Sequence, residues 1–275
     1  ILKRLAGSNN GKGLEGVART HKYSVSADGN SHNVVMDRAD TTLWDVMRRR
    51  NLTEEDVLLL GKRLLEVVDR LHGIGIWHLD IKPENIGIPL KDGEPDYGKA
   101  ILIDFGISLD SRGRDNVAAN EVSGTLLYMS PETVAGTYSA KSDLYAIGII
   151  LYWVLAEPKQ RRLIDSRMDE KMAIAEDGRE EFPELTALEN KSKAYRLIRA
   201  LTWSDYGKRI GSARQAIAML EGKEGPPKAG LGGFGALILT VGISALAAGK
   251  AMAGETLGQA GAIFAGTNTI LSVAL

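Results

Sequence analysis

The sequence has no cysteine and almost no net charge, and these two absences exclude several classes of protein. Without cysteine the chain can form neither a disulfide nor a thiolate zinc site, and its four histidines do not lie at the spacings of metal ligands. Its 34 Lys and Arg residues nearly balance 35 Asp and Glu residues, so the net charge is only −1. Because nucleic-acid binding needs a basic surface, we expect no nucleic-acid partner.

The rest of the composition is typical of a folded, globular chain. Among its 275 residues, 44% are apolar and 25% are charged, which is enough to bury a large core. The length indicates one large domain, or one domain with an appendage. The chain begins at Ile1 with neither a Met nor a charged leader before an apolar run, so we expect further residues upstream and no signal peptide in view.

Hydrophobic periodicity divides the chain into a short β-rich part and a longer helical part. Two β-rich runs, 17–25 and 31–36, flank a turn at 27–30 and predict a hairpin. The stretch 53–71 predicts a long helix, because Thr53 can cap it and apolar residues then repeat at helical spacing. The remaining predicted elements are a strand at 101–103 and helices at 143–155, 195–203 and 213–220.

A run of residues after the long helix carries the first chemical signal. It reads His78-Leu79-Asp80-Ile81-Lys82-Pro83-Glu84-Asn85, and its Asp and Asn stand five positions apart. Phosphoryl transfer requires a carboxylate beside the incoming hydroxyl, a cation near the transferred phosphate and oxygen ligands for Mg²⁺. Asp80, Lys82 and Asn85 supply these three kinds of group within one loop.

Three further motifs follow this loop in the sequence. Asp104-Phe105-Gly106 comes directly after the predicted strand at 101–103 and supplies a second carboxylate for a metal ion. Gly124-Thr125 and then Ser130-Pro131-Glu132 come later. Each motif alone is more often a turn or a surface loop, but four motifs in this order are hard to obtain by chance.

In this order the motifs resemble those of the eukaryotic-like Ser/Thr protein kinase family, which is also found in bacteria. The resemblance covers residues 1–221 and implies an α+β, protein-kinase-like fold with a mainly helical C-lobe and a partial β N-lobe. It also implies ATP and Mg²⁺ as cofactors and a protein with a Ser or Thr acceptor as the substrate. By the same resemblance Asp80 is the catalytic base and Lys82 steadies the transferred phosphoryl group. Asn85 and Asp104 are the implied metal ligands.

The resemblance also implies which residues bind adenine. The segment Val34 to Ala39 lies where the family has its hinge strand, which makes Met36 the gatekeeper. Asp37 and Ala39 then become the backbone partners of adenine. In the catalytic part, Lys82 and Thr125 match the Ser/Thr branch of the family.

Other residues are expected to serve the scaffold. By the resemblance, Asp143 opens a buried helix and anchors the backbone of the catalytic loop, and Glu132 pairs with Arg209 inside the helical lobe. We interpret His78 and Phe105 as packed structural residues without a role in proton transfer.

The sequence departs from the family pattern at Leu79. Most members carry there an Arg that pairs with a phosphate on the activation segment. That Arg orders the segment and is not needed for the chemistry itself. A phosphate-gated switch is therefore disfavoured, and we expect activity to be constitutive or controlled by a ligand.

A larger departure lies before the hinge, where no glycine-rich hairpin, strand lysine or helix-C glutamate can be placed. The run Gly11–Gly16 fits G-x-G-x-x-G but is too close to Met36 for two strands and a helix, so we interpret it as a loop. We assign 1–5 to the tail of helix C, because Lys3 could imitate the ATP-binding lysine only if helix C were severely shortened. We expect the missing lobe to lie upstream, and this chain alone to bind ATP poorly and to be inactive.

The end of the chain has a different composition. Residues 222–230 read as a linker, and 231–275 form a hydrophobic segment rich in Gly and Ala. The stretch 229–249 has no charge and is long enough to cross about 30 Å of hydrocarbon as a helix. We expect a transmembrane helix or hairpin there, which would tether a cytoplasmic kinase domain to the inner or plasma membrane. A buried helix of a soluble protein is the alternative.

Two other functions share parts of this pattern. A pseudokinase or signalling scaffold would keep the fold as a binding module and transfer no phosphate. A small-molecule phosphotransferase of related fold would share Asp80, Asn85 and the metal-binding Asp104, but it does not usually carry Ser130-Pro131-Glu132 and Asp143.

Overall fold

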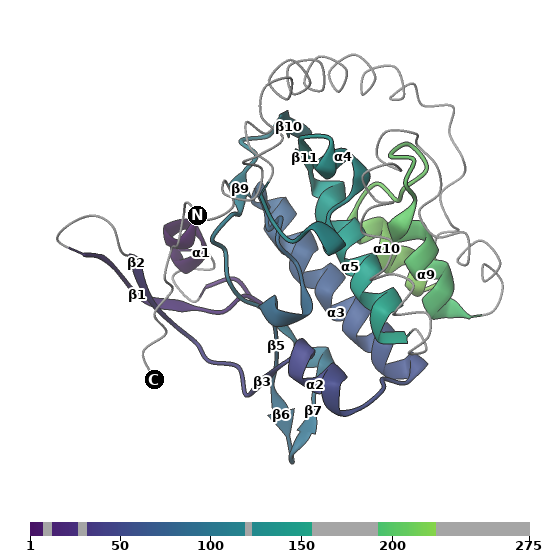
Figure 1. Ribbon diagram of the computed structural model, residues 1–275, viewed down its shortest axis with the longest axis horizontal. Coiled ribbons are helices and arrows are strands. Elements are labelled where there is room, and N and C mark those ends of the chain that lie inside the picture. Colours follow the sequence, from purple (N-terminus) through teal and green to yellow (C-terminus); the bar gives the residue numbers. More distant parts are fainter. Residues whose placement is uncertain (8–12, 27–31, 119–122, 156–191, 224–275) are drawn as a thin grey trace, which may run out of the picture. The chain divides into compact units, whose positions relative to one another are not determined.

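The computed structural model describes residues 1–7, 13–26, 32–118, 123–155 and 192–223 (Figure 1). Their contacts divide the chain into two units. The larger unit contains residues 1–18 and 38–232, and the smaller one contains the hairpin within residues 19–37. Each unit is described by itself.

The long helix α3 (Glu54–Gly73) is the first half of the helical core, and its start is set by a capping box. Thr53 Oγ1 accepts a hydrogen bond from the Asp56 amide at 3.1 Å, and Asp56 Oδ2 accepts one from the Thr53 amide at 2.9 Å. An apolar stripe from Val57 to Leu71 is fully buried. The predicted helix over 53–71 is therefore confirmed.

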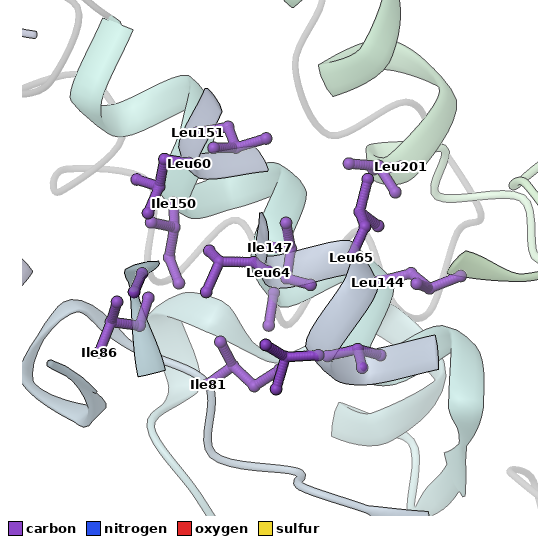
Figure 2. Packing of buried hydrophobic residues seen from close by; sticks show 14 of the residues in the cluster. Leu60, Leu64, Leu65, Ile81, Ile86, Leu144, Ile147, Ile150, Leu151 and Leu201 are labelled. Carbon is purple, nitrogen blue, oxygen red and sulfur yellow. The ribbon is translucent and has the colours of Figure 1, made fainter. Parts of the chain in front are cut away.

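The second half of the core is α5 (Ala140–Leu155), which packs beside α3 and is buried along nearly its whole length. Helices α9 (Lys193–Thr202) and α10 (Ala213–Leu220) pack against this pair. Figure 2 shows Leu64 of α3 and Ile147 of α5 meeting in the interior, with Leu201 of α9 close by. All three predicted helices after residue 140 are confirmed, and α5 begins three residues earlier than expected.

Short strands and helices hold the loops that surround this core. The central three-stranded sheet has the order β3-β5-β8, with antiparallel pairing throughout. Its strands are β3 (Thr41–Thr42), β5 (Ile86–Ile88) and β8 (Ile101–Leu102). The other pairs are β4 (Ile76–Trp77) with β9 (Leu109–Asp110), β6 (Leu90–Lys91) with β7 (Glu94–Pro95), and β10 (Asn116–Ala118) with β11 (Thr137–Ser139). The short helices are α1 (Leu2–Gly7), α2 (Leu43–Arg49), α4 (Pro131–Val134) and the 3-10 turns Pro83–Asn85, Tyr97–Lys99 and Leu126–Tyr128.

The predicted hairpin is present as β1 (Thr20–Val25) and β2 (His32–Met36), paired antiparallel with an irregularity between Thr20 and Lys22. The expected turn at 27–30 lies outside the described residues. The first strand is shorter than predicted. Instead of extending it, Val17 forms an isolated parallel bridge with Leu102 in the larger unit.

The G-x-G-x-x-G run has a packing role in this fold. Gly13 and Gly16 both have positive φ, and Gly16 lies against α3 so closely that a Cβ atom would be 2.2 Å from Val67 Cγ2. Leu102 N donates to the Gly16 carbonyl at 2.8 Å. The described part of the run, residues 13–16, is therefore a loop packed against α3, which agrees with the expected loop.

The predicted linker and hydrophobic segment lie almost entirely outside the described residues, which end at 223 in this region. Among the helices that the structure does describe, none is both long enough and apolar enough to span a membrane. The membrane span over 231–275 stays a prediction.

The crossing of α5 and α9 generates a prediction about stability. A Cβ atom at Gly148 would lie 2.6 Å from Thr202 Cγ2 and 2.8 Å from Leu201 Cβ, so the two helices approach across a glycine. We expect Gly148→Ala to lower the free energy of unfolding by about 1–3 kcal/mol through overpacking, measured by urea denaturation.

Gly73→Ala, also in a helix, is the matched control. Nothing lies within 4 Å of the added Cβ atom at that position. This variant should leave the free energy of unfolding unchanged or raise it by up to about 1 kcal/mol. Equal effects of the two substitutions would contradict the packing argument.

Candidate active site

The predicted catalytic residues lie in the loop between β4 and β5. The loop leaves β4 at Trp77, passes Asp80 and Lys82, and ends in a 3-10 turn, Pro83–Asn85, that leads directly into β5. Because both flanking strands are paired and buried, the ends of the loop are fixed. The loop is therefore a short, supported connection between two rigid elements.

Asp80 is the centre of a hydrogen-bonding network. Its Oδ2 lies 2.8 Å from Lys82 Nζ and accepts a hydrogen bond from Asn85 Nδ2 at 3.0 Å. Its Oδ1 accepts one from Thr125 Oγ1 at 3.1 Å. The side chains of Asp80 and Lys82 are 13% and 24% exposed, so they can meet a ligand while water around them is limited.

Thr125 joins this network from the activation segment, more than forty residues further along the chain. Lys82 Nζ donates to Thr125 Oγ1 at 3.2 Å, while the same hydroxyl donates to Asp80. The structure thus brings Asp80, Lys82 and Asn85 together, as their common loop predicted, and adds Thr125 to them.

Asp104 follows β8 and lies at the neighbouring strand end. Leu102 on β8 pairs with Ile86 on β5, and Ile103 N donates to the Asn85 carbonyl at 3.0 Å. Asp104 itself has φ +61, a left-handed conformation that Asp tolerates better than most residues. Its Oδ1 accepts a hydrogen bond from Gly106 N at 3.1 Å. The two predicted metal ligands therefore flank the paired ends of adjacent strands, Asn85 just before β5 and Asp104 just after β8.

The free oxygen atoms of these two residues fit a magnesium ion. Both hydrogen bonds of the Asn85 amide, to the carbonyl and to Oδ2 of Asp80, use Nδ2, so its Oδ1 is the atom left for a ligand. Within the described ranges, no group of three or more His, Cys, Asp or Glu side chains could hold a metal by itself. Mg²⁺ commonly binds one or two carboxylates together with phosphate oxygens and water, which suits this sparse donor set.

Asp143, at the start of α5, anchors the catalytic loop as expected. Its buried carboxylate accepts hydrogen bonds from the backbone amides of His78 at 2.9 Å and Leu79 at 2.7 Å. It also accepts one from His72 Nε2 at 2.8 Å. Burial alone would raise the pKa of Asp143, but the hydrogen bond and charge of His72 and the nearby amides outweigh burial and lower that pKa.

His72 is a site residue that sequence reasoning missed. It lies in the last turn of α3, and 71 residues separate it from Asp143. No periodicity or motif distinguishes it, since it follows the apolar stripe as an ordinary C-terminal basic residue. Only the packing of α3 against α5 reveals that it completes the hydrogen bonds of Asp143.

The end of the activation segment is held by an ion pair that the sequence did predict. Arg209 Nη1 and Nη2 donate to the two carboxylate oxygens of Glu132 at 2.6 and 3.0 Å, and both side chains are buried. Arg209 Nε also donates to the Trp203 carbonyl at 2.8 Å. This bidentate geometry fixes the segment on the helical core.

The predicted adenine partners are divided between the two units. Met36 ends β2, and Asp37 follows it in the hairpin unit, where its carboxylate accepts hydrogen bonds from Arg19 N at 3.1 Å and from His21 Nε2 at 2.6 Å. Ala39 belongs to the larger unit. It packs beside β5, where a Cβ atom at Gly87 would be only 2.5 Å from Ala39 Cβ. The role of these three residues with adenine stays a prediction.

Comparisons with known proteins agree with this site. The family model described as "Protein kinase domain" matches residues 19–220. Serine/threonine-protein kinase pkn3 of Myxococcus xanthus is 38% identical over 109 residues, which are 38% of this chain and 20% of the relative. CDPK-related kinase 5 of Arabidopsis thaliana is 31% identical over 158 residues, 56% of this chain and 24% of the relative. A calcium/calmodulin-dependent serine/threonine-protein kinase 1 of Oryza sativa is 29% identical over 219 residues, 78% of this chain and 34% of the relative.

The chain belongs to the protein kinase domain family, because the family match spans most of its length. The resemblance to Ser/Thr kinases, with a bacterial kinase among the similar proteins, is confirmed. The matched stretches cover only a fifth to a third of the relatives' own lengths.

The surroundings of His78 generate a prediction about pH. Burial lowers the pKa of His78, and the contacts of its ring suit a neutral imidazole. Nε2 lies 3.2 Å from the Ile103 carbonyl and must be the donor there, because a carbonyl oxygen only accepts. Nδ1 accepts a hydrogen bond from Asp80 N at 3.4 Å. In the unfolded chain a His has a pKa of about 6.5.

The folded state resists protonation of His78, whereas the unfolded chain does not. The neutral His78 ring therefore contributes its full share of the free energy of unfolding above about pH 6.5, and this share is lost as the pH falls below that value. We expect the free energy of unfolding to fall between about pH 6.5 and pH 5. His78→Gln, which can donate and accept at the same places, should reduce this slope. Chemical denaturation at a series of pH values gives both slopes, and equal slopes would refute the assignment.

Proposed function

We propose that this chain provides the catalytic lobe of an ATP-dependent Ser/Thr protein kinase, which transfers the γ-phosphate of ATP to protein hydroxyls. The observation that carries the proposal is the network around Asp80. One carboxylate is oriented by Lys82, Asn85 and Thr125 at the end of the sheet that also carries Asp104. This arrangement would supply a base, a cation and metal ligands within one small region.

Asp80 would receive or orient the proton of the acceptor hydroxyl. Its Oδ1 accepts a hydrogen bond from the hydroxyl of Thr125, so this oxygen is already directed toward a hydroxyl-bearing segment. Lys82 stays close to the same carboxylate and can place its positive charge beside the phosphoryl group in transfer. ATP with Mg²⁺ would supply the phosphoryl group and a charge that stabilises its leaving oxygen.

Asn85 and Asp104 would hold the metal ion through oxygen atoms. The Asn85 amide nitrogen is occupied by Asp80, which fixes the direction of its oxygen. Asp104 is held in its left-handed conformation by the turn to Gly106. Most of the rate enhancement would then come from position and charge, because the chemistry needs little covalent participation by the protein.

A protein Ser or Thr hydroxyl is the proposed acceptor. Thr125 bridges Asp80 and Lys82, which couples the segment expected to bind the substrate to the base. Two of the similar proteins named above, those of Myxococcus xanthus and Oryza sativa, are called serine/threonine-protein kinases. The protein substrate, together with use of ATP and Mg²⁺, belongs to the proposal.

The metal-binding role of Asp104 provides the test. Asp104→Asn keeps the size of the side chain and its tolerance of positive φ but removes the negative charge. In the full-length protein, we expect this change to lower phosphate transfer to a Ser/Thr-containing protein such as casein by more than about 100-fold. Transfer is measured with radiolabelled ATP, and phosphopeptide mass spectrometry identifies the acceptor residues.

Asp69→Asn is the matched control, since it removes a carboxylate on α3 whose ion pair is with the exposed Arg214 of α10, outside the catalytic loop. It should leave transfer unchanged. Normal turnover by a folded Asp104→Asn protein would disprove the assignment. A wild-type full-length protein that binds ATP but transfers no phosphate would instead favour the pseudokinase or scaffold.

A further inference from the structure

The peptide group between His78 and Leu79 is held at both of its polar ends. Its N–H, that of Leu79, donates to Asp143 Oδ1 at 2.7 Å. Its carbonyl, that of His78, accepts a hydrogen bond from Ser108 Oγ at 3.1 Å. The first contact comes from α5, and the second comes from the segment that follows Asp104-Phe105-Gly106.

This peptide group needs such support because of the residue that follows it. Leu79 has φ +66, in the left-handed region that a bulky side chain seldom adopts. Asp80 comes next, so the orientation of the held peptide and the φ of Leu79 together set the direction of the Asp80 side chain. A backbone conformation of this kind persists only where neighbouring groups fix it.

The register of the strands explains why Ser108 reaches this carbonyl. β4 and β9 pair antiparallel, with Ile76 opposite Asp110 and Trp77 opposite Leu109. One step further along the same register, His78 stands opposite Ser108. Backbone pairing ends there, because Ser108 N instead contacts the Phe105 carbonyl at 3.3 Å in the turn after Asp104. The Ser108 hydroxyl therefore continues the ladder by one hydrogen bond.

We infer that Ser108 is a positioning residue that couples the metal-binding segment to the catalytic loop. While Asp104 and Gly106 keep the turn between them, the Ser108 hydroxyl holds the His78 carbonyl. The held peptide group then sets the orientation of Asp80. The expected effect of Ser108 on catalysis rests on the proposed function. Its expected effect on the order of the loop does not. The link joins only the Ser108 hydroxyl and the His78 carbonyl, so it needs no phosphate on the activation segment.

The test compares Ser108→Ala with Ser108→Thr, which keeps a hydroxyl, in the full-length protein after treatment with phosphatase. We expect Ser108→Ala to lower kcat about tenfold, which corresponds to about 1.4 kcal/mol of activation free energy. KM for ATP should change less than about twofold, because Ser108 acts through Asp80 and not on the nucleotide. Ser108→Thr should restore kcat to within about twofold of the wild type.

Ser123→Ala is the control in the same segment, since the Ser123 side chain is exposed and only its backbone amide and carbonyl contact the Tyr138 hydroxyl. It should leave kcat and KM unchanged. If Ser108→Ala does not fold, Ser108→Cys keeps the volume with a weaker donor and should show the same direction of change.

Amide hydrogen exchange gives a measurement that does not depend on catalysis. In Ser108→Ala, a peptide covering residues 76–85 should exchange faster than in the wild type and in Ser108→Thr, while a peptide from α3 should not change. Unchanged exchange in Ser108→Ala, or a Thr variant as impaired as the Ala variant, would overturn the inference. If the wild type transfers no phosphate, the proposed function fails, and the exchange result alone decides on Ser108.

Discussion

The active-site loop depends on a single buried carboxylate, that of Asp143. Its side chain is 1% exposed and accepts hydrogen bonds from two loop amides and from His72. A buried charge is tolerated only when such partners surround it, and removing a partner of a buried charge typically costs about 3–5 kcal/mol. Because Asp143 lies on α5 and His72 on α3, the position of the catalytic loop is set by the two central helices of the core.

The described parts of the activation segment contact the same core at three places. Its first part pairs with β4 through β9, its middle meets Asp80 through Thr125, and its end is held by the buried pair of Glu132 and Arg209. Leu79 supplies no cation at the place where a phosphate-binding Arg would stand. Strand pairing, one hydroxyl contact and one bidentate ion pair hold the segment, and the absence of a phosphate-gated switch stays a prediction.

Elements with a strong local signal could be predicted from the sequence, and elements defined by a distant partner could not. The long helix α3 was recognised from its capping box and apolar stripe, and α5 from its apolar run. The seven-residue helix α2 and the pair β10–β11 were missed, because so few residues carry almost no periodicity. Gly16 fits a phosphate-loop pattern, yet its contact with Val67 shows a packing role.

The sequence by itself determined which chemical groups the site contains, since its motifs supply two carboxylates, a cation and an amide in a fixed order. The motifs also indicated that Asp143 and Glu132 serve the scaffold. The tertiary structure alone decided which partners complete it. His72 and Ser108 carry no motif, and they reach the catalytic loop only because α3 packs on α5 and β9 pairs with β4. Periodicity reports which face of an element is buried, whereas a hydrogen bond between distant residues depends on packing and register, which local sequence does not encode.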